Sequence, residues 1–195
     1  MAERRLTFPT TEEEIRTLRA GDLVTVDGHI IGIRDRTQIR IFDQGVEPPT
    51  DLSGAFLLHT APGVRKREDG SGYDPVSIGT TTSARMVRFT EPLGRDHGVR
   101  AICGKGGLPD EAIEPMRRYG MVYFAIVGGA AALETTQIEE IEEVFWEELM
   151  PECLWKFRVK DFGPLWVGID SHGNSLFHDV QEAAKKKLED IYARL

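Results

Sequence analysis

Short apolar runs, separated by glycine, proline and charged residues, recur along the whole chain. The apolar runs at 55–58 and 121–127, and the stretch 99–103 with its single arginine, predict buried strands, since a strand covered on both faces does not alternate with polar residues. Residues 23–33 alternate β-forming side chains around an Asp-Gly pair at 27–28. This pattern predicts two antiparallel strands joined by a type I′ turn.

Helical patterns alternate with these strands. In the N-terminal arm, residues 1–20, Thr10 and Thr11 each stand three residues before a glutamate, Glu13 and Glu14, which is a capping signal and predicts a short helix. Further helices are expected at 34–43, at 81–89, from Pro109 to about 118, and at 178–195 as a charged amphipathic C-terminal helix.

The order of these elements predicts a single domain that covers residues 1–195. A connection rich in glycine, proline and charge spans 61–76 and is expected to be irregular. Apolar strands on both sides of it favour one domain over two. Strands that alternate with helices, together with an early hairpin, predict an α/β fold with a mixed sheet and packed helices.

The composition narrows the function. The chain has 195 residues, 41% of them hydrophobic, which is enough for one ordinary domain. Its formal charge of −8 is concentrated at 134–153, where eight glutamates occur without a lysine or arginine. Because nucleic acids need a basic surface, they are not expected partners. We interpret the acidic segment as a solvated face, and an acidic docking surface is the alternative.

Membrane and redox signals point to an ordinary intracellular protein. No apolar stretch approaches the roughly 20 residues of a membrane span, and the first residues lack a signal-peptide core. A cytoplasmic, reducing location is therefore expected. The two cysteines, Cys103 and Cys153, exclude a disulfide framework, a paired zinc site and a self-contained cubane iron–sulfur cluster, which needs at least three thiolates.

Three places combine the end of a predicted strand, glycine and a cation. The first is Arg34. The second is the Gly-Thr-Thr-Thr loop at 79–82, which leads into the helix expected to carry Arg85; free N–H groups at the start of a helix favour an anion. The third is Lys105, between glycines that allow close approach of a ligand. A helix that begins near Thr81 would place Arg85 on the same face, four residues on.

Together these places suit a small molecule with two carboxylates. They supply three cations, the hydroxyls of Thr81 and Thr82, and backbone donors. Arginine binds a planar carboxylate through two parallel hydrogen bonds, whereas lysine acts as a point charge. Each place alone has an ordinary alternative: an ion pair of Arg34 with Asp35, a helix cap made by the threonines, or a solvated turn lysine at Lys105.

Nucleotide-binding motifs do not fit the glycine pattern. In a Walker loop four residues separate two glycines and Lys-Ser/Thr follows, but Gly98 is one position too far from Gly104, and Gly106 follows the lysine. A dinucleotide fingerprint needs glycine where Pro109 stands. The five histidines lack the spacing of metal ligands. No metal or nucleotide cofactor is expected on this chain itself.

The chain resembles the β subunit, or the equivalent C-terminal domain, of iron–sulfur hydro-lyases of the class I fumarase and L-tartrate dehydratase type. The resemblance runs from Gly21 to about Phe177. The segments that carry this resemblance are, in chain order, Arg34-Asp35, 79–86, Gly104-Lys105-Gly106, 127–131 and 170–174. One departure is Gln38, where similar chains often have histidine. The resemblance implies a swivelling β/β/α type of fold.

The resemblance also implies a site. In that family an arginine, a threonine, a second arginine and a lysine surround the bound dicarboxylate. Carried onto this sequence, these residues are Arg34, Thr81, Arg85 and Lys105, and Thr82 is a further substrate-binding residue. Thr81, Arg85 and Lys105 are the expected catalytic residues, with Thr81 as the candidate base.

The implied reaction is reversible addition of water to a carbon–carbon double bond, with fumarate to L-malate as the leading expectation. The resemblance implies a [4Fe–4S] cluster carried by a partner α subunit, in agreement with the two cysteines of this chain. One alternative is a subunit of an L-tartrate or related C4-dicarboxylate dehydratase. Another is a non-catalytic module for dicarboxylate binding or assembly. An isolated half with an open substrate face could also form a homo-oligomer.

Overall fold

An eleven-residue strand, β2 (Leu23–Ile33), lies at the centre of the sheet in the computed structural model, which describes residues 2–128 and 131–192. One edge of β2 pairs in parallel with β1 (Glu3–Phe8) and then with β3 (Phe56–His59). The other edge pairs antiparallel with the sixteen-residue strand β9 (Leu154–Ile169). Because both edges are used, β2 joins the two ends of the sheet.

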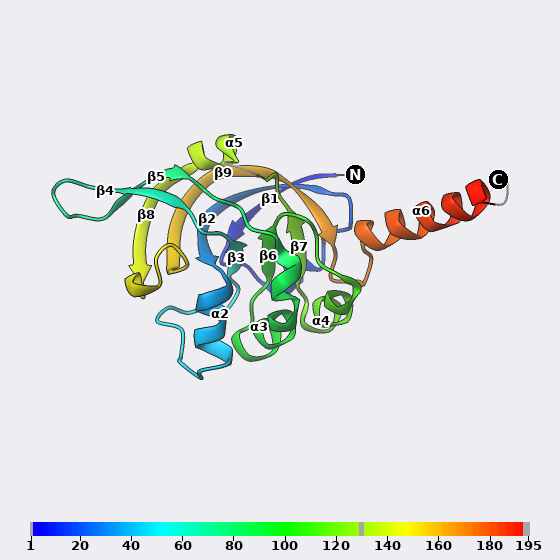
Figure 1. Cartoon of the computed structure of the whole chain (residues 1–195), viewed down its shortest axis with the longest axis horizontal. Coiled ribbons are helices and arrows are strands. Elements are labelled where there is room, and N and C mark those ends of the chain that lie inside the picture. Colours follow the sequence, from blue (N-terminus) through cyan, green and yellow to red (C-terminus); the bar gives the residue numbers. More distant parts are fainter. Residues whose placement is uncertain (1, 129–130, 193–195) are drawn as a thin grey trace.

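The sheet closes on itself. The remaining strands are β4 (Gly63–Lys66), β5 (Tyr73–Ser77), β6 (Ala101–Gly104), β7 (Val122–Ala125) and β8 (Ile138–Phe145). The strand order is β1-β2-β3-β6-β7-β9-β8, and the extra pairing of β2 with β9 makes β2, β3, β6, β7 and β9 a closed barrel (Figure 1). Parallel and antiparallel pairs both occur, so the prediction of an α/β domain with a mixed sheet is confirmed.

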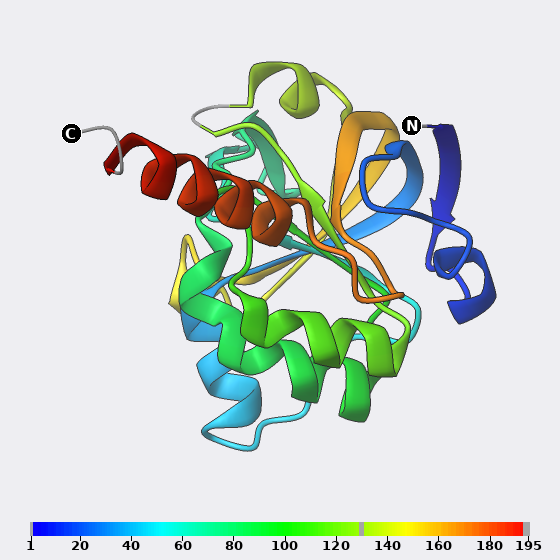
Figure 2. The ribbon, with the colours of Figure 1, turned by 90° about the vertical axis from the view of Figure 1, so that its right-hand side faces the viewer.

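Helices and 3₁₀ turns lie around the barrel. They are α1 (Glu12–Ile15), α2 (Asp35–Phe42), the 3₁₀ helix η1 (Ser83–Phe89), α3 (Thr90–His97), the 3₁₀ turn η2 (Asp110–Ala112), α4 (Ile113–Tyr119), α5 (Ala132–Thr136), the 3₁₀ turn η3 (Glu147–Leu149) and α6 (Leu176–Tyr192). Figure 1 shows α2, α3 and α4 together below the barrel, which gives two β walls and one helical layer. α6 extends away from this body in Figure 1, and in the turned view of Figure 2 it lies in front of the body.

The apolar runs divide between two cores. Phe56 and Leu58 of β3 point into the barrel, where Phe56 stacks on Phe124 with ring centroids 5.6 Å apart. Leu57 points the other way and packs under the helices, together with Ile102 of β6. Both faces of these strands are therefore buried, which explains why the runs at 55–58, 99–103 and 121–127 do not alternate.

The predicted hairpin at 23–33 is wrong. Asp27 and Gly28 continue a single strand, because β1 and β9 pair on both sides of it. Gly28 has φ 97° and lies where the register with β9 shifts, so the Asp-Gly pair makes a bulge in the strand. A Cβ at Gly28 would lie 2.3 Å from the carbonyl oxygen of Phe8, so glycine permits the close approach of β1.

The N-terminal arm is only partly helical. The capping box predicted at Thr11 and Glu14 is present, with the Glu14 N–H donating to Thr11 Oγ1 (3.2 Å), but α1 has four residues. Before it, β1 adds a strand that was not predicted, with Leu6 and Phe8 facing the core. The prediction of a helical arm at residues 1–20 is thus corrected to a strand followed by one helical turn.

The connection at 61–76 is also more regular than expected. β4 and β5 form an antiparallel two-stranded sheet there, so the prediction of an irregular segment is wrong. The short helix predicted at 34–43 is present as α2. The C-terminal helix is present from Leu176 to Tyr192, and residues 193–195 lie outside the described ranges, as do Gly129 and Ala130 of the predicted glycine–alanine run. Within those ranges no helix is long and apolar enough to cross a membrane.

The acidic segment forms the edge strand β8, not only a solvated face. Its glutamates pair with cations of β9: Glu143 with Lys156 at 2.7 Å and Glu140 with Arg158 at 2.6 Å. These cross-strand ion pairs neutralise part of the local charge. Much of the acidic segment is therefore an ordinary charged strand edge, which resists pairing with other chains.

Candidate active site

Two of the three predicted cations, Arg34 and Lys105, lie at the carboxyl ends of parallel strands, and His59 ends the strand between them. Arg34 follows β2, His59 ends β3, and Lys105 follows β6. These three strands are adjacent and parallel, so their ends meet at one edge of the barrel, which is where open α/β sheets bind ligands. The strand order therefore brings together residues that are 71 positions apart in the sequence.

The threonine loop crosses these strand ends. The Thr81 N–H donates to the carbonyl of His59 (2.8 Å), and the Lys105 N–H donates to the carbonyl of Thr81 (3.1 Å). The Ser83 N–H then donates to the carbonyl of Lys105 (3.0 Å), and Thr82 pairs with Lys105 as a parallel bridge. Thr81, Thr82 and Lys105 are thus joined through their backbones.

This arrangement corrects the prediction that Thr81 starts a helix. The 3₁₀ helix η1 begins at Ser83, so Thr81 and Arg85 do not share a helical face four residues apart. The N–H groups of Thr81 and Ser83 are used by His59 and Lys105, so they are not free to bind an anion. Charge at this edge comes from side chains and not from a helix N-terminus.

Gly104 allows the loop to lie this close. A Cβ at Gly104 would be 2.2 Å from Ser83 Oγ and 3.0 Å from the carbonyl oxygen of Thr81. After Lys105, Gly106 and Gly107 have φ 78° and 76°, a left-handed turn that returns the chain. The backbone itself therefore requires these glycines: Gly104 for close packing, and Gly106 and Gly107 for their positive φ.

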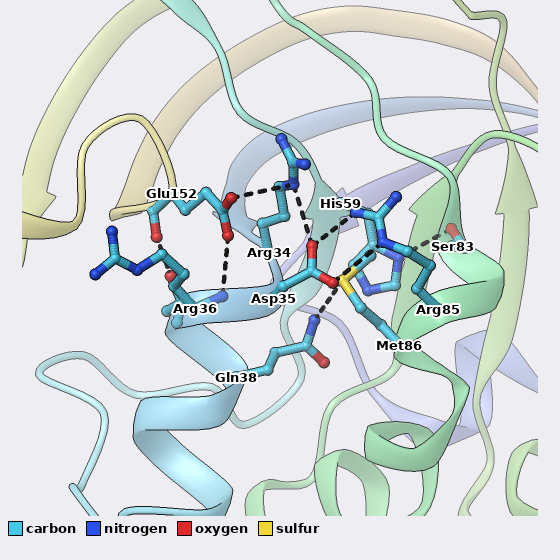
Figure 3. A network of polar contacts seen from close by, with 10 residues as sticks. Arg34, Asp35, Arg36, Gln38, His59, Ser83, Arg85, Met86 and Glu152 are labelled. Carbon is cyan, nitrogen blue, oxygen red and sulfur yellow. Dashed lines mark hydrogen bonds and ion pairs between the residues drawn. The ribbon is translucent and has the colours of Figure 1, made fainter.

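Arg34 and Arg85 meet on one carboxylate, that of Asp35 (Figure 3). Arg85 donates twice, from Nε to Oδ1 (3.2 Å) and from Nη2 to Oδ2 (2.7 Å), and Arg34 donates from Nε to Oδ2 (3.1 Å). The hydrogen bonds from Arg85, and then those from Arg34, lower the pKa of Asp35. The ion pair of Arg34 with Asp35, which was the ordinary alternative, is present, and Arg85 joins it.

Donors remain for a ligand. Within the described part of the chain, no residue accepts a hydrogen bond from Nη1 or Nη2 of Arg34, and none contacts the half-buried Lys105 ammonium as an ion pair or hydrogen-bond partner. Thr81 is buried, with 6% of its surface exposed, and Thr82 is half-buried. The edge therefore has unused donors on a guanidinium and an ammonium group, next to the backbone of Thr81 and Thr82.

A buried polar chain that the sequence did not reveal supports this edge. Nδ1 of His59 is hydrogen-bonded to Ser83 Oγ (2.9 Å), and the Tyr123 hydroxyl donates to the Gly104 carbonyl (2.6 Å) and lies 3.1 Å from Ser83 Oγ. Burial lowers the pKa of His59 to about 3, so the imidazole is neutral. The only sequence signal was that His59 ends an apolar run.

Gln38 lies in the layer beneath the arginines. It is fully buried, and its Nε2 donates to the sulfur of Met86 (3.0 Å), the residue after Arg85. Neither Oε1 of Gln38 nor Nε2 of His59 has a hydrogen-bond partner among the described residues. Figure 3 shows Gln38, Met86 and the His59 ring gathered under Asp35 and Arg85. Gln38, which stands where similar chains often have histidine, is therefore buried behind Arg34 and Arg85.

The cysteines do not fit an iron–sulfur cluster. Cys103 lies inside the barrel, and burial raises its pKa; Cys153 is buried too, with its pKa raised to about 11. Cluster ligands are thiolates, which these environments disfavour. Over the described ranges, no group of three or more His, Cys, Asp or Glu side chains is placed to hold a metal ion.

Comparison with known proteins identifies the family of this chain. Residues 2–180 match the family model described as Fumarase C-terminus. The chain is 40% identical over 187 residues, 95% of its length, to L(+)-tartrate dehydratase subunit beta of Escherichia coli K12, of which this covers 92%. It is 36% identical over 186 residues to a putative L(+)-tartrate dehydratase subunit beta of Methanocaldococcus jannaschii, covering 93% and 94% of the two chains.

A third relative has a different organisation. The chain is 37% identical over 194 residues, 97% of its length, to a putative fumarate hydratase class I of Geobacillus stearothermophilus, but this covers only 37% of that protein. The same domain thus occurs as a whole subunit in some relatives and as part of a longer chain in another. The chain belongs to the fumarase C-terminus family of hydro-lyase subunits and domains.

Proposed function

We propose that this chain is the β subunit of a two-subunit hydro-lyase that dehydrates L-tartrate. Relatives that match it end to end are named L(+)-tartrate dehydratase subunit beta, whereas the relative named fumarate hydratase is a much longer chain. The names therefore favour the tartrate alternative over the leading expectation of fumarate hydration. Fumarate hydration remains the second candidate, supported by the match of nearly the whole chain to that longer relative.

The observation that carries this proposal is the set of cations at one barrel edge. Arg34 follows β2, Arg85 lies in η1 and Lys105 follows β6; the strand order relates Arg34 to Lys105, and the carboxylate of Asp35 joins Arg34 to Arg85. L-Tartrate and fumarate both carry two carboxylates, and guanidinium and ammonium groups bind carboxylates strongly. A dicarboxylate thus has donors for both of its ends.

These cations also suit the reaction. Elimination of water from tartrate removes a proton next to a carboxylate, and negative charge grows on that carboxylate in the transition state. Fixed cations stabilise the transition state more than the ground state, which is the condition for catalysis. We assign this stabilisation to Lys105 and Arg85, with Arg34 gripping a carboxylate and Thr82 hydrogen-bonding the substrate.

Thr81 is the proposed proton-transfer residue of this half. A threonine hydroxyl is a weak base and needs a neighbouring base or a charge-stabilised alkoxide. The backbone hydrogen bond from Lys105 to Thr81 holds the segment that carries this cation next to the threonine loop, which favours an alkoxide. The buried position of Thr81 reduces competition from water for that charge.

The remaining parts of the site would come from a partner. We propose that a cluster-bearing α subunit completes the site, because the cysteines of this chain do not fit a cluster and its relatives are named as beta subunits. A cluster with an open iron supplies a Lewis acid for the leaving hydroxyl group when it is bound. This chain's contribution is to hold the carboxylates and to accept the proton.

A substrate panel on the two-chain complex tests the proposal. The complex of this chain with its α subunit, with the cluster reconstituted under anaerobic conditions, is assayed with L-tartrate, its stereoisomers, L-malate, fumarate and methylated C4 diacids. The expected result is the highest kcat/KM with L-tartrate, with oxaloacetate as product. A higher kcat/KM for fumarate would assign the second function. Dicarboxylate binding without turnover of any substrate would assign a non-catalytic module.

A further inference from the structure

We propose that Asp35 is a positioning residue that fixes the guanidinium groups of Arg34 and Arg85 as one carboxylate-binding pair. This inference deepens the proposed function, on which its kinetic test rests. It starts from the position of Asp35, which is the first residue of α2, directly after Arg34. Arg85 lies 50 residues away in η1, and among the described residues the Asp35 carboxylate is the one group that binds both arginines (Figure 3).

The contacts use one edge of each guanidinium and leave others open. Arg85 binds Asp35 through Nε and Nη2, and Arg34 binds it through Nε alone. Nη1 of Arg85 and both terminal nitrogens of Arg34 have no acceptor in the described part of the chain. Asp35 therefore determines where these guanidiniums point without occupying all of their donors.

The charges also require a carboxylate between the arginines. Two guanidiniums this close repel each other, and the repulsion is stronger at a half-buried edge than in water. Asp35 is half-buried, and the lowered pKa keeps it ionised at neutral pH. Glu152 is the second carboxylate nearby, with Oε1 3.7 Å from Nε of Arg34. With Lys105 included, three cations face two carboxylates, so the edge stays positive for a dianionic substrate.

The backbone beneath Asp35 is itself held in place. Oε2 of Glu152 accepts a hydrogen bond from the N–H of Arg36 (3.0 Å) and so caps the start of α2 from a distant loop. The Thr37 hydroxyl donates to the carbonyl of Glu152. On the other side, Gln38 of α2 donates to Met86 of η1. A carboxylate on this fixed turn is well suited to orient flexible arginine side chains.

The same two elements contain a matched control. Asp43 follows α2 and binds Arg88 of η1 through Nη1 to Oδ1 (2.9 Å) and Nη2 to Oδ2 (2.6 Å). This pair joins α2 to η1 just as Asp35 and Arg85 do, and it lies outside the proposed site. Asp43→Asn therefore measures the effect of losing an α2–η1 ion pair, and Asp35→Asn adds the effect on the substrate-binding arginines.

The first test needs no turnover. In ¹⁵N-arginine-labelled chain, the Nε–H groups of Arg34 and Arg85 are assigned with lysine substitutions, and their hydrogen exchange is measured. Asp35→Asn should speed exchange at both groups, whereas Asp43→Asn should leave them unchanged. Unchanged exchange in Asp35→Asn would overturn the proposal, whether or not the complex proves to be a hydro-lyase.

The second test uses the active two-chain complex. Asp35→Asn should lower kcat/KM for the preferred dicarboxylate by about 10- to 100-fold, mainly through KM, because the carboxylate-binding groups lose their orientation. Asp43→Asn should match the wild type. Equal losses of kcat/KM in the two variants would show that Asp35 only joins α2 to η1 and does not orient the arginines. A lower KM in Asp35→Asn would show that Asp35 competes with the substrate for the arginines. A wild-type complex without turnover would refute the proposed function and leave the exchange test to decide on Asp35.

Discussion

The packing around Gly104 makes a quantitative prediction about how the loop of Thr81 is held. In Gly104→Ala, the new methyl group would lie 2.2 Å from Ser83 Oγ, 3.0 Å from the Thr81 carbonyl oxygen and 3.2 Å from Cβ of His59. Ser83 must move, and its hydrogen bonds to His59 and Tyr123 are lost. Overpacking costs about 1–3 kcal/mol, and each lost hydrogen bond about 1 kcal/mol. The free energy of unfolding should therefore fall by about 3–5 kcal/mol.

Urea unfolding of the isolated chain measures this loss, with Gly63→Ala as the matched control. Gly63 is exposed in β4, and a methyl group there would meet only Ser77 Oγ at 3.0 Å, with other atoms at 3.9 Å or more. Its expected change is below about 1 kcal/mol. In the double variant Gly104→Ala/Ser83→Ala, the clashing oxygen is absent, so the two losses should be less than additive by about 1 kcal/mol or more. Additivity within about 0.5 kcal/mol would refute the packing argument.

Three further outcomes are expected from the same contacts. Arg85→Lys loses the two-pronged contact with Asp35 and the fork for substrate, so kcat/KM of the two-chain complex should fall substantially; unchanged kinetics would remove Arg85 from the site. Burial lowers the pKa of His59 to about 3, so below about pH 6.5 the unfolded chain binds a proton that the folded chain does not. As the pH is lowered from about 6 to about 4, this residue should reduce the free energy of unfolding by about 1.4 kcal/mol per pH unit. Urea unfolding of His59→Gln should lack this pH-dependent loss, and equal pH slopes in the variant and the wild type would contradict the prediction. Burial raises the pKa of the Cys103 thiol, so the native chain should react with a thiol reagent at this site only as fast as it unfolds, and rapid alkylation of Cys103 found by mass spectrometry would contradict the burial.

Strands whose own residues are apolar on both faces were predictable from the sequence. Elements whose form depends on pairing with residues far away in the sequence were not. β3, β6 and β7 are apolar on both faces, so local composition is sufficient to identify them. The Asp-Gly pair in β2 is a strong local turn signal, but pairing with β1 and β9 outweighs it and leaves a bulge. Contacts far apart in sequence thus decided between turn and strand.

β8 shows a second reason for a missed strand. Its buried residues, Ile138 and Ile141, are three positions apart, which does not match the two-residue period of a strand. Register shifts against β9 lie between Ile138 and Glu140 and between Ile141 and Glu143. Each bulge adds a residue and changes which face the following side chains point to. The sequence therefore hides the alternation.

The site was predictable to the extent that it follows strand ends. Arg34 and Lys105 were each expected to follow a strand, and the structure has them after β2 and β6, two parallel strands on either side of β3. The sharing of Asp35 by two arginines could not be predicted, because it depends on how η1 packs on α2. His59 was missed for a similar reason, since its hydrogen-bond partner Ser83 begins η1, 24 residues away.

The most direct test of the central claim is the effect of Lys105→Gln on the assembled enzyme. Lys105 makes no side-chain hydrogen bond or ion pair within the described residues, so its loss should leave folding, α-subunit binding and cluster content as in the wild type. If this chain supplies the cations that stabilise the transition state, kcat/KM for L-tartrate should fall by about 100-fold or more. An intact Lys105→Gln complex with wild-type kcat/KM would contradict the claim that this barrel edge is half of the active site.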